Sequence, residues 1–248
     1  MIGPRLSSVI ERRLLVNYRV DPDIAANLLP APLRPQLVRG RAVAGICLLR
    51  VGAVRPGRSP APLGLRSENA AHRISVEWDG PDGLETGVYI PRRDSASRLN
   101  VLAGGRIFPG GHGHADFTVR ETADEVRVAF ATRDGEVRVD ATVENADELR
   151  DSELFADLAE ASDFFRAGAR GLSPNATGRR LDVLEMNTDA WRVTAGRARS
   201  VRSSFFEDTE RFPAGSATLD SVLVMRDVPA DWSPRAPFPL PAPATRPG

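Results

Sequence analysis

Apolar and polar residues alternate in short runs along most of this chain. Ile74, Val76 and Trp78 alternate with polar neighbours, and comparable apolar-rich runs occupy 11–20, 36–54, 84–91, 115–121, 125–133, 136–144, 181–186, 190–200 and 217–225. A period of two residues is typical of a strand with one buried face. Asp134-Gly135, between two of these runs, is a strong hairpin signal. The pattern predicts many short strands separated by turns.

Three segments predict helices instead. Asp21 suits the N-cap and Pro22 the first position of a short helix that stops at Pro30. The clearest amphipathic helix is predicted over 152–167, where apolar residues recur on one stripe. A third, over 94–103, would be capped by Asp94, and a polar loop is predicted over 168–180. Few helices among many strands favour a mainly β fold with a few α-helices, an antiparallel barrel or sandwich.

The length of 248 residues suits a single domain, which we place at residues 1–232. Residues 233–248 hold six prolines in 16 positions, so this tail is predicted to be disordered. The single cysteine, Cys47, excludes an intrachain disulfide and a multi-cysteine zinc site. It stands in the apolar run AGICLL and is predicted to be an inert core thiol.

Charge narrows the classes of partner. The 33 basic and 33 acidic residues balance, which argues against a general binder of nucleic acid or anionic membranes. The longest apolar stretch, 42–49, is far shorter than the roughly 20 residues that span a bilayer. Arg5, Arg12 and Arg13 interrupt any signal-peptide core, so we expect a cytoplasmic protein.

All 33 basic residues are arginine, and the chain contains no lysine. A guanidinium stays protonated and does not form an imine with a carbonyl group. Mechanisms that need a Schiff-base lysine, a P-loop lysine or a pyridoxal-phosphate lysine are therefore excluded. We expect no cofactor.

The glycine-rich segment GGRIFPGGHGH, residues 104–114, is the most unusual part of the sequence. It lacks the Gly-Lys-Ser/Thr of a phosphate-binding loop, and it precedes a predicted strand, unlike a dinucleotide fingerprint. It is either a turn or a loop whose bare backbone lets a ligand approach. Exposed loop positions are the favoured interpretation of the histidines, and a metal site formed by His72, His112 and His114 is the weaker alternative.

Two charged residues are candidates for chemistry. Glu68, at the start of a predicted strand, would act as a general acid or base if it faced a desolvated interior, and is otherwise an exposed glutamate. Arg106 would hold a substrate carboxylate through its planar fork, or else form an ion pair with an acid such as Asp94.

The order of several segments resembles the acetoacetate decarboxylase-like superfamily, and in particular its YqjF-like branch, a domain of unknown function. These segments are RRLLVNYRVDPDIAANLLPAPL at 12–33, SEN at 67–69, ISVEWDG at 74–80, GVYIPRRD at 87–94, AGGRIFPGG at 103–111 and the stretch 203–232. The resemblance implies a mostly antiparallel β-barrel that encloses a small-molecule cavity, with homo-oligomers in many members. It places the family's cavity glutamate at Glu68 and its loop arginine at Arg106. The family's first-strand arginine has no secure match and falls near Glu11, beside Arg12 and Arg13.

The decarboxylases carry a lysine pair after a proline, and here Pro109 is followed by Gly110 and Gly111. We therefore predict no imine-dependent decarboxylation. The favoured hypothesis is a binding protein for a small carboxylated or keto ligand. The ligand would contact Glu68, Arg106, Tyr89, Pro109, Gly110, Gly111, His112 and His114. The alternative is a lyase, hydratase or isomerase in which Glu68 moves a proton and Arg106 stabilises an enolate.

Overall fold

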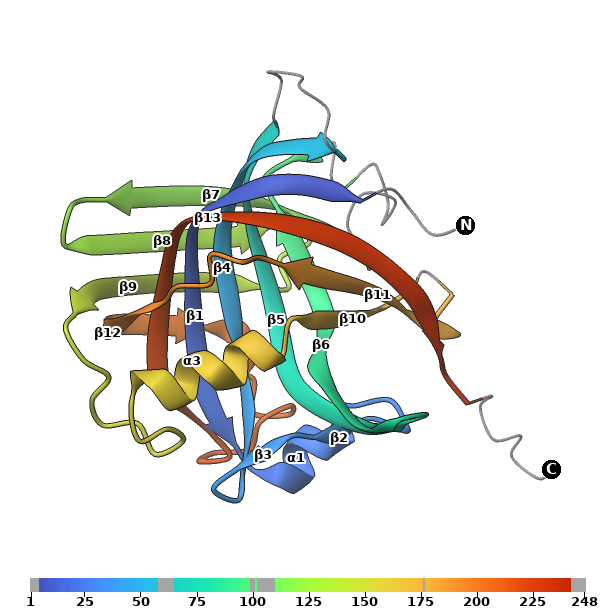
Figure 1. The fold of residues 1–248 in the computed structure, drawn as a ribbon. Coiled ribbons are helices and arrows are strands. Elements are labelled where there is room, and N and C mark those ends of the chain that lie inside the picture. Colours follow the sequence, from blue (N-terminus) through green and yellow to red (C-terminus); the bar gives the residue numbers. More distant parts are fainter. Residues whose placement is uncertain (1–4, 58–64, 99–100, 102–109, 176, 242–248) are drawn as a thin grey trace.

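The strands of this protein pair into one continuous sheet in a computed structural model that describes residues 5–57, 65–98, 101, 110–175 and 177–241 (Figure 1). In chain order the elements are β1 (Leu6–Val20), α1 (Pro22–Asn27), β2 (Arg34–Pro35), β3 (Leu37–Val38), β4 (Arg41–Pro56), β5 (Leu65–Gly80), β6 (Gly83–Ser95), β7 (His112–Glu121), β8 (Glu125–Thr132), β9 (Arg138–Ala146), α3 (Leu158–Ala167), β10 (Arg170–Pro174), β11 (Arg180–Asn187), β12 (Thr194–Ser203), α4 (Ser204–Glu207) and β13 (Ala217–Pro239).

The sheet closes into a ring. Strands β13, β1, β4, β5, β6, β7, β8, β9 and β12 are hydrogen-bonded in that order, and β12 pairs back to β13. Strands β10 and β11 make a second connection, because β10 pairs with β6 and β11 pairs with β13. All pairings are antiparallel except β6 with β7 and β6 with β10. The mainly β fold class is therefore confirmed.

Both faces of β1 are buried over 14–18, and both faces of β4 are buried over 42–48. Leu14 and Val16 of β1 point into the ring, where they join Val128 and Phe130 from the opposite wall. Leu15, between them, faces the other way and packs with Phe155 and with Phe165 of α3. Figure 1 shows α3 lying across β1, β4 and β5. A polar side chain within these stretches, such as that of Asn17, is consequently enclosed.

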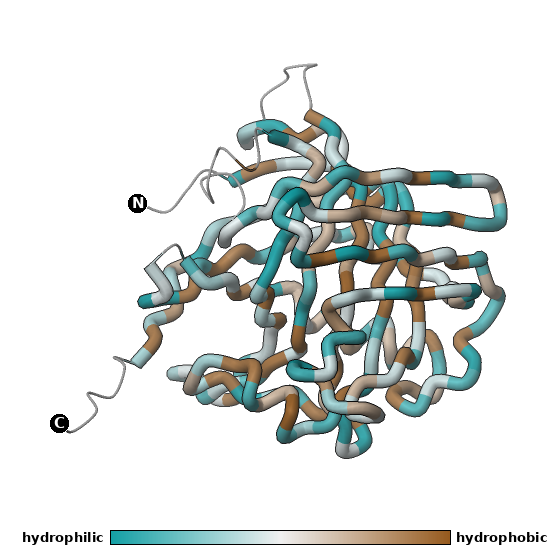
Figure 2. Tube along the Cα trace, turned by 180° about the vertical axis from the view of Figure 1, so that it is seen from behind, coloured by the Kyte–Doolittle hydropathy of each residue, from teal (hydrophilic) through white to brown (hydrophobic). Residues whose placement is uncertain are grey.

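Local signals place several boundaries correctly. The side chain of Asp21 accepts hydrogen bonds from the backbone N–H groups of Asp23 and Ile24, as an N-cap does. Figure 2 shows hydrophilic and hydrophobic residues alternating along the strands that were predicted from this pattern. Gly135 adopts a φ of +78° between β8 and β9, the positive value that this hairpin turn requires.

The helix predicted over 152–167 is shorter than expected. It starts at Leu158, and Asp157 is its N-cap. The residues before it are held by the carboxylate of Asp220 on β13, which accepts hydrogen bonds from the Ser152 hydroxyl and from the backbone N–H of Glu153. This tertiary contact replaces the helical hydrogen bonds that periodicity alone predicted.

Three further expectations need correction. Asp94 does not cap a helix but lies inside β6, and β10 occupies part of the loop predicted over 168–180. The tail expected to be disordered from residue 233 continues as β13 to Pro239. Its prolines are tolerated because this segment pairs with β11 on one side only, and Phe238 anchors it against Trp78, ring centroid to ring centroid 5.6 Å.

No helix in the described part of the chain is long and apolar enough to cross a membrane.

Candidate functional site

Glu68 lies on β5 and points to the inner side of the ring, the face that also carries Ala70 and Ile74. Its Oε2 accepts a hydrogen bond from Nη2 of Arg12 at 2.5 Å, and its Oε1 accepts one from Nε of Arg50 at 2.5 Å. Arg12 comes from β1 and its side chain is only 1% exposed. Arg12 is one of the two arginines that stand next to Glu11 in the sequence.

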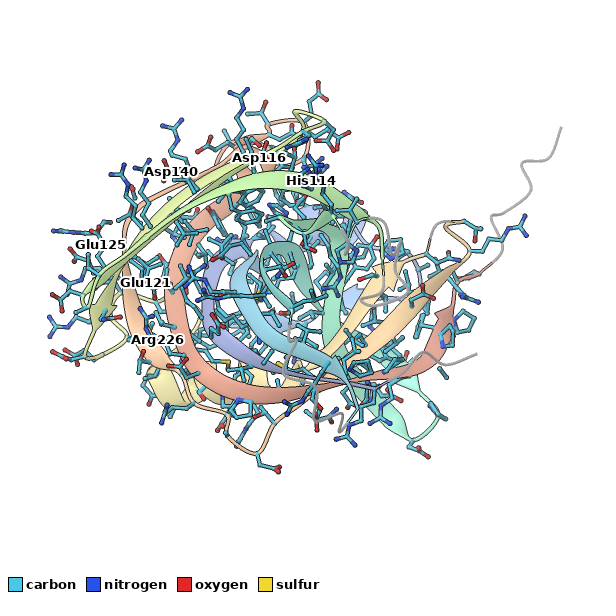
Figure 3. The ribbon with its side chains drawn as sticks, turned by 90° about the horizontal axis from the view of Figure 1, so that it is seen from above. His114, Asp116, Glu121, Glu125, Asp140 and Arg226 are labelled. Carbon is cyan, nitrogen blue, oxygen red and sulfur yellow. The ribbon has the colours of Figure 1, made fainter. Side chains whose placement is uncertain are left out.

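A second carboxylate, Glu121 at the end of β7, completes this cluster. Its Oε2 lies 3.3 Å from Nη1 of Arg12 and 3.3 Å from Nη1 of Arg50, and its Oε1 accepts a hydrogen bond from Arg226. Burial alone would raise the pKa of Glu121, but the hydrogen bond from Arg226 and the charge of Arg12 hold it below its ordinary value. Figure 3 shows Glu121 and Arg226 on the same side of the ring.

These five side chains form an ion-pair network of three guanidinium groups and two carboxylates, Arg12, Arg50, Arg226, Glu68 and Glu121. Each oxygen of Glu68 accepts a charge-assisted hydrogen bond from a guanidinium, and these two bonds fix the orientation of the carboxylate. The arrangement fits a structural role for Glu68 better than proton transfer.

The other candidates from the sequence are spread over the molecule. Tyr89 is buried on β6 in the core of the ring, and burial raises the pKa of its hydroxyl. Gly110 has a φ of +92°, and an added Cβ would come 2.7 Å from Cβ of Ser173, so a side chain there is strained. Gly111 is exposed and has open space beside it. Arg106 and Pro109 lie outside the described residues.

The histidines do not converge. His72 is completely buried on β5, and its ring packs against that of Phe205 at a centroid distance of 4.3 Å, so its predicted exposed loop position was wrong. Burial, with the charges of Arg92 and Arg211, lowers the pKa of His72 to about 3. A neutral imidazole is therefore part of the core.

His112 and His114 belong to β7 and are half-buried rather than exposed in a loop. Nδ1 of His112 lies 3.0 Å from the carbonyl oxygen of Gly110, and burial lowers the pKa of His112 to about 4. Within the described ranges, no group of three or more His, Cys, Asp or Glu side chains is placed to hold a metal ion.

A cavity of about 70 Å³ lies on the other face of β1, β4 and β5, beneath α3. Its polar lining consists of three arginines from three strands, Arg13 of β1, Arg73 of β5 and Arg93 of β6, together with Cys47 of β4. The rest of the wall is mainly apolar, with Val88, Ile90, Phe165, Leu184, Met186 and Trp232 among its residues. We call this the arginine cavity.

The guanidinium groups of the arginine cavity have no carboxylate partner among the residues that the structure describes. Arg73 is 3% exposed, and it donates one hydrogen bond, from Nη2 to Oδ1 of Asn17. Its Nε and Nη1 are buried without a partner, and its guanidinium lies 4.7 Å from the ring centroid of Phe165. Arg93 donates from Nε to the hydroxyl of Ser173 at 3.2 Å.

The pKa values of two cavity arginines reflect burial without a neighbouring carboxylate. Burial is the main reason that the pKa of Arg73 is lowered to about 10. Cys47 opposes this shift, and the charge of Arg13 adds to it. Burial also lowers the pKa of Arg93 to about 10. Buried cations without an anion are costly in proteins, and they are usually paired or bind a ligand. The cavity is thus chemically matched to a small anion.

Cys47 is buried, and its sulfur takes part in the same set of contacts. Nε of Arg13 donates to Sγ of Cys47 at 2.9 Å, and Nη1 of Arg13 reaches Sδ of Met186 at 3.8 Å. Cys47 is thus buried as expected, but the sequence did not show the hydrogen bond from Arg13.

Sequence reasoning missed the arginine cavity, although one signal was present. The run LLV at 14–16 is apolar at consecutive positions, which indicates a strand covered on both faces. Arg13 stands directly before this run, so its side chain is expected to lie against other parts of the protein on either face. Arg73 stands within the predicted strand at 67–78. Their convergence with Arg93 was not readable, because it depends on strand order.

Comparisons with known proteins agree with this fold. The family model DUF2071, described as an uncharacterized conserved protein, matches residues 9–225. A search of curated proteins found no match. Among solved structures, the acetoacetate decarboxylase of Legionella pneumophila is 12% identical, with a TM-score of 0.59, over 97% of this chain and 88% of that one.

Two further solved structures are similar to this chain. The enduracididine biosynthesis enzyme MppR complexed with pyruvate is 15% identical, with a TM-score of 0.55, over 97% of this chain and 91% of that one. An acetoacetate decarboxylase-like enzyme from Sphingomonas wittichii RW1 is 14% identical, with a TM-score of 0.56, over 96% of this chain and 93% of that one. Identities this low establish the shared fold alone.

Proposed function

The chain belongs to the DUF2071 family, and from that premise we propose that it binds a small carboxylate or keto acid in the arginine cavity, without forming an imine. The ligand carboxylate is held by Arg73 and Arg93, and its short carbon chain contacts the apolar wall. This proposal keeps the ligand class expected from the sequence but moves the site from Glu68 to the opposite face of the sheet.

The observation that carries the proposal is the unpartnered guanidinium of Arg73. Two of its nitrogens are buried without an acceptor, at the edge of a cavity that two further arginines line. A guanidinium presents a planar fork of donors that fits the two oxygens of a carboxylate. A bound carboxylate would therefore satisfy these donors and offset the unpaired charge in one step.

The size and the lining of the cavity support an organic rather than an inorganic anion. A volume of about 70 Å³ exceeds the roughly 10–15 Å³ that one water molecule needs, so a ligand of a few heavy atoms fits. Apolar side chains such as Ile90, Leu184 and Phe165 favour a ligand that has a carbon chain behind its charged group. MppR, which has a similar fold, was solved in complex with pyruvate, a small keto acid.

Imine formation does not belong to the proposal, because no side-chain primary amine is available. The chain has no lysine, and the positions after Pro109 are glycines. Recognition must therefore come from the guanidinium groups.

Isothermal titration calorimetry with pyruvate and with propionate tests this function. We expect saturable binding of both ligands to the wild type, and affinities at least about tenfold weaker in Arg73→Met and in Arg93→Met, the equivalent of about 1.4 kcal/mol. Arg127→Met is the matched control, because Arg127 is half exposed on β8 and paired with Asp140. No saturable heat with either ligand, or the same affinity in all three variants, would contradict the proposal.

A further inference from the structure

The cavity thiol has an unusual electrostatic setting. Cys47 is a free cysteine, and its sulfur accepts the hydrogen bond from Nε of Arg13. Arg73 and Arg93 line the same cavity as Cys47 and Arg13, so the sulfur lies near three cations. Nucleophilic cysteines characteristically have electropositive neighbours and some access to a ligand. Cys47 has such neighbours, and although it is only 4% exposed, it lines a cavity.

The unpartnered donors of Arg73 provide an independent indication that a ligand belongs beside this thiol. Arg73 and Cys47 line the same small cavity, from the adjacent strands β5 and β4. A carboxylate bound to Arg73 has little room to place the rest of its chain away from the sulfur, because the whole cavity holds only a few heavy atoms. An electrophilic carbon next to the carboxylate therefore comes within reach of Sγ.

We propose that Cys47 adds reversibly to the carbonyl carbon of a small α-keto or α-aldehydo acid bound in the arginine cavity, giving a hemithioacetal or hemithioketal. This inference rests on the proposed function for the position of the carboxylate. The chain has no lysine side chain to capture a carbonyl compound. The proposal assigns this capture to the thiol instead.

The step balances without any further reactant. The sulfur forms a bond to the carbonyl carbon, the π electrons of the C=O bond move to oxygen, and the thiol proton ends on that oxygen as a hydroxyl group. Nothing is oxidised or reduced, and no group leaves. The guanidinium of Arg13, which donates to the sulfur, remains beside the new hydroxyl group and stabilises negative charge that develops on its oxygen.

The experiment compares glyoxylate with glycolate, which has the same number of carbons but no electrophilic carbon. Wild-type protein and Cys47→Ala are titrated with both compounds, and [2-¹³C]glyoxylate is followed by ¹³C NMR. Circular dichroism checks that the variant is folded. We expect the wild type to bind glyoxylate at least about tenfold more tightly than glycolate, about 1.4 kcal/mol. A protein-bound carbon resonance, distinct from that of free glyoxylate hydrate, should accompany this preference.

In Cys47→Ala the preference for glyoxylate over glycolate and the bound resonance should both disappear. A wild type without that resonance, or a variant that keeps both the resonance and the preference, would overturn the role of Cys47. Failure of glycolate to bind either protein would instead contradict the carboxylate site. The resonance would still report separately on the thiol, so the two proposals fail in different measurements.

Discussion

Replacing Arg73 by methionine is expected to make the ligand-free protein more stable, although the substitution removes a buried hydrogen bond. Lowering the pKa of a guanidinium from 12.5 to about 10 disfavours its charged form by about 3 kcal/mol, at about 1.4 kcal/mol for each pKa unit. Methionine fills similar space with a flexible apolar chain and carries no such cost.

The losses in Arg73→Met are smaller than this gain. Oδ1 of the fully buried Asn17 loses its donor and the contact with the ring of Phe165 disappears, and these two losses together cost about 2 kcal/mol. The net result is an increase of about 1 kcal/mol in the free energy of unfolding. For a chain of this length, that corresponds to a rise of about 2–4 °C in Tm.

The measurement is urea unfolding followed by circular dichroism at pH 7, on protein that has been unfolded, dialysed and refolded so that any bound ligand is lost. Arg12→Met is the matched control, because Arg12 is an equally buried arginine whose guanidinium is paired with Glu68 and Glu121. Breaking that pair should destabilise the protein by about 3–5 kcal/mol. If Arg73→Met is instead destabilised by about 2 kcal/mol or more, approaching the loss in the control, the guanidinium of Arg73 is satisfied in the free protein and the argument for an anion site fails.

Three other substitutions test separate parts of the structure. His72 binds its proton with a pKa of about 3 in the folded protein and about 6.5 when unfolded, so the wild type should lose stability as the pH falls from 6.5 toward 4, by up to about 1.4 kcal/mol per pH unit. His72→Phe should show a shallower loss in urea unfolding across this range, and parallel curves would contradict the buried neutral ring. Glu68→Gln should lower the free energy of unfolding by about 2–3 kcal/mol because Arg12 loses its main counter-charge. The control Glu210→Gln, at an exposed residue, should change this free energy little. Equal effects of the two substitutions would show that the ion-pair network does not stabilise the fold. Gly110→Ala should lower Tm, because the new Cβ would clash with Ser173 and because alanine disfavours the positive φ at this position. Gly111→Ala is the control and should leave Tm unchanged, because open space lies beside Gly111. A larger drop in Tm for Gly111→Ala than for Gly110→Ala would refute this backbone geometry at Gly110.

Some residues of the two charged sites could be recognised from the sequence, but their partners could not. Glu68 was conspicuous in the sequence as a carboxylate at the start of an apolar strand, but the sequence left open whether it faced the interior or the solvent. Its partner Arg12 is 56 positions away in the sequence, and a one-residue change in strand register would have turned Arg12 to the other face. The arginine next to it, Arg13, shows this directly, since it points into the arginine cavity.

The sequence by itself determined the local features of this protein. The alternation of apolar and polar residues set the strands, Asp21-Pro22 set the start of α1, and Asp134-Gly135 set a hairpin, because each of these signals acts within a few residues. The lack of lysine, and with it of any side-chain primary amine, is likewise read from the sequence alone.

Only the tertiary structure decided which charges are paired. Closure of the ring brings Arg12, Glu68 and Glu121 together on one face of the sheet, and it leaves Arg13, Arg73 and Arg93 facing each other on the other. The same closure lets Asp220 shorten α3. These contacts join residues far apart in sequence, and they depend on the order and register of strands that no local pattern encodes.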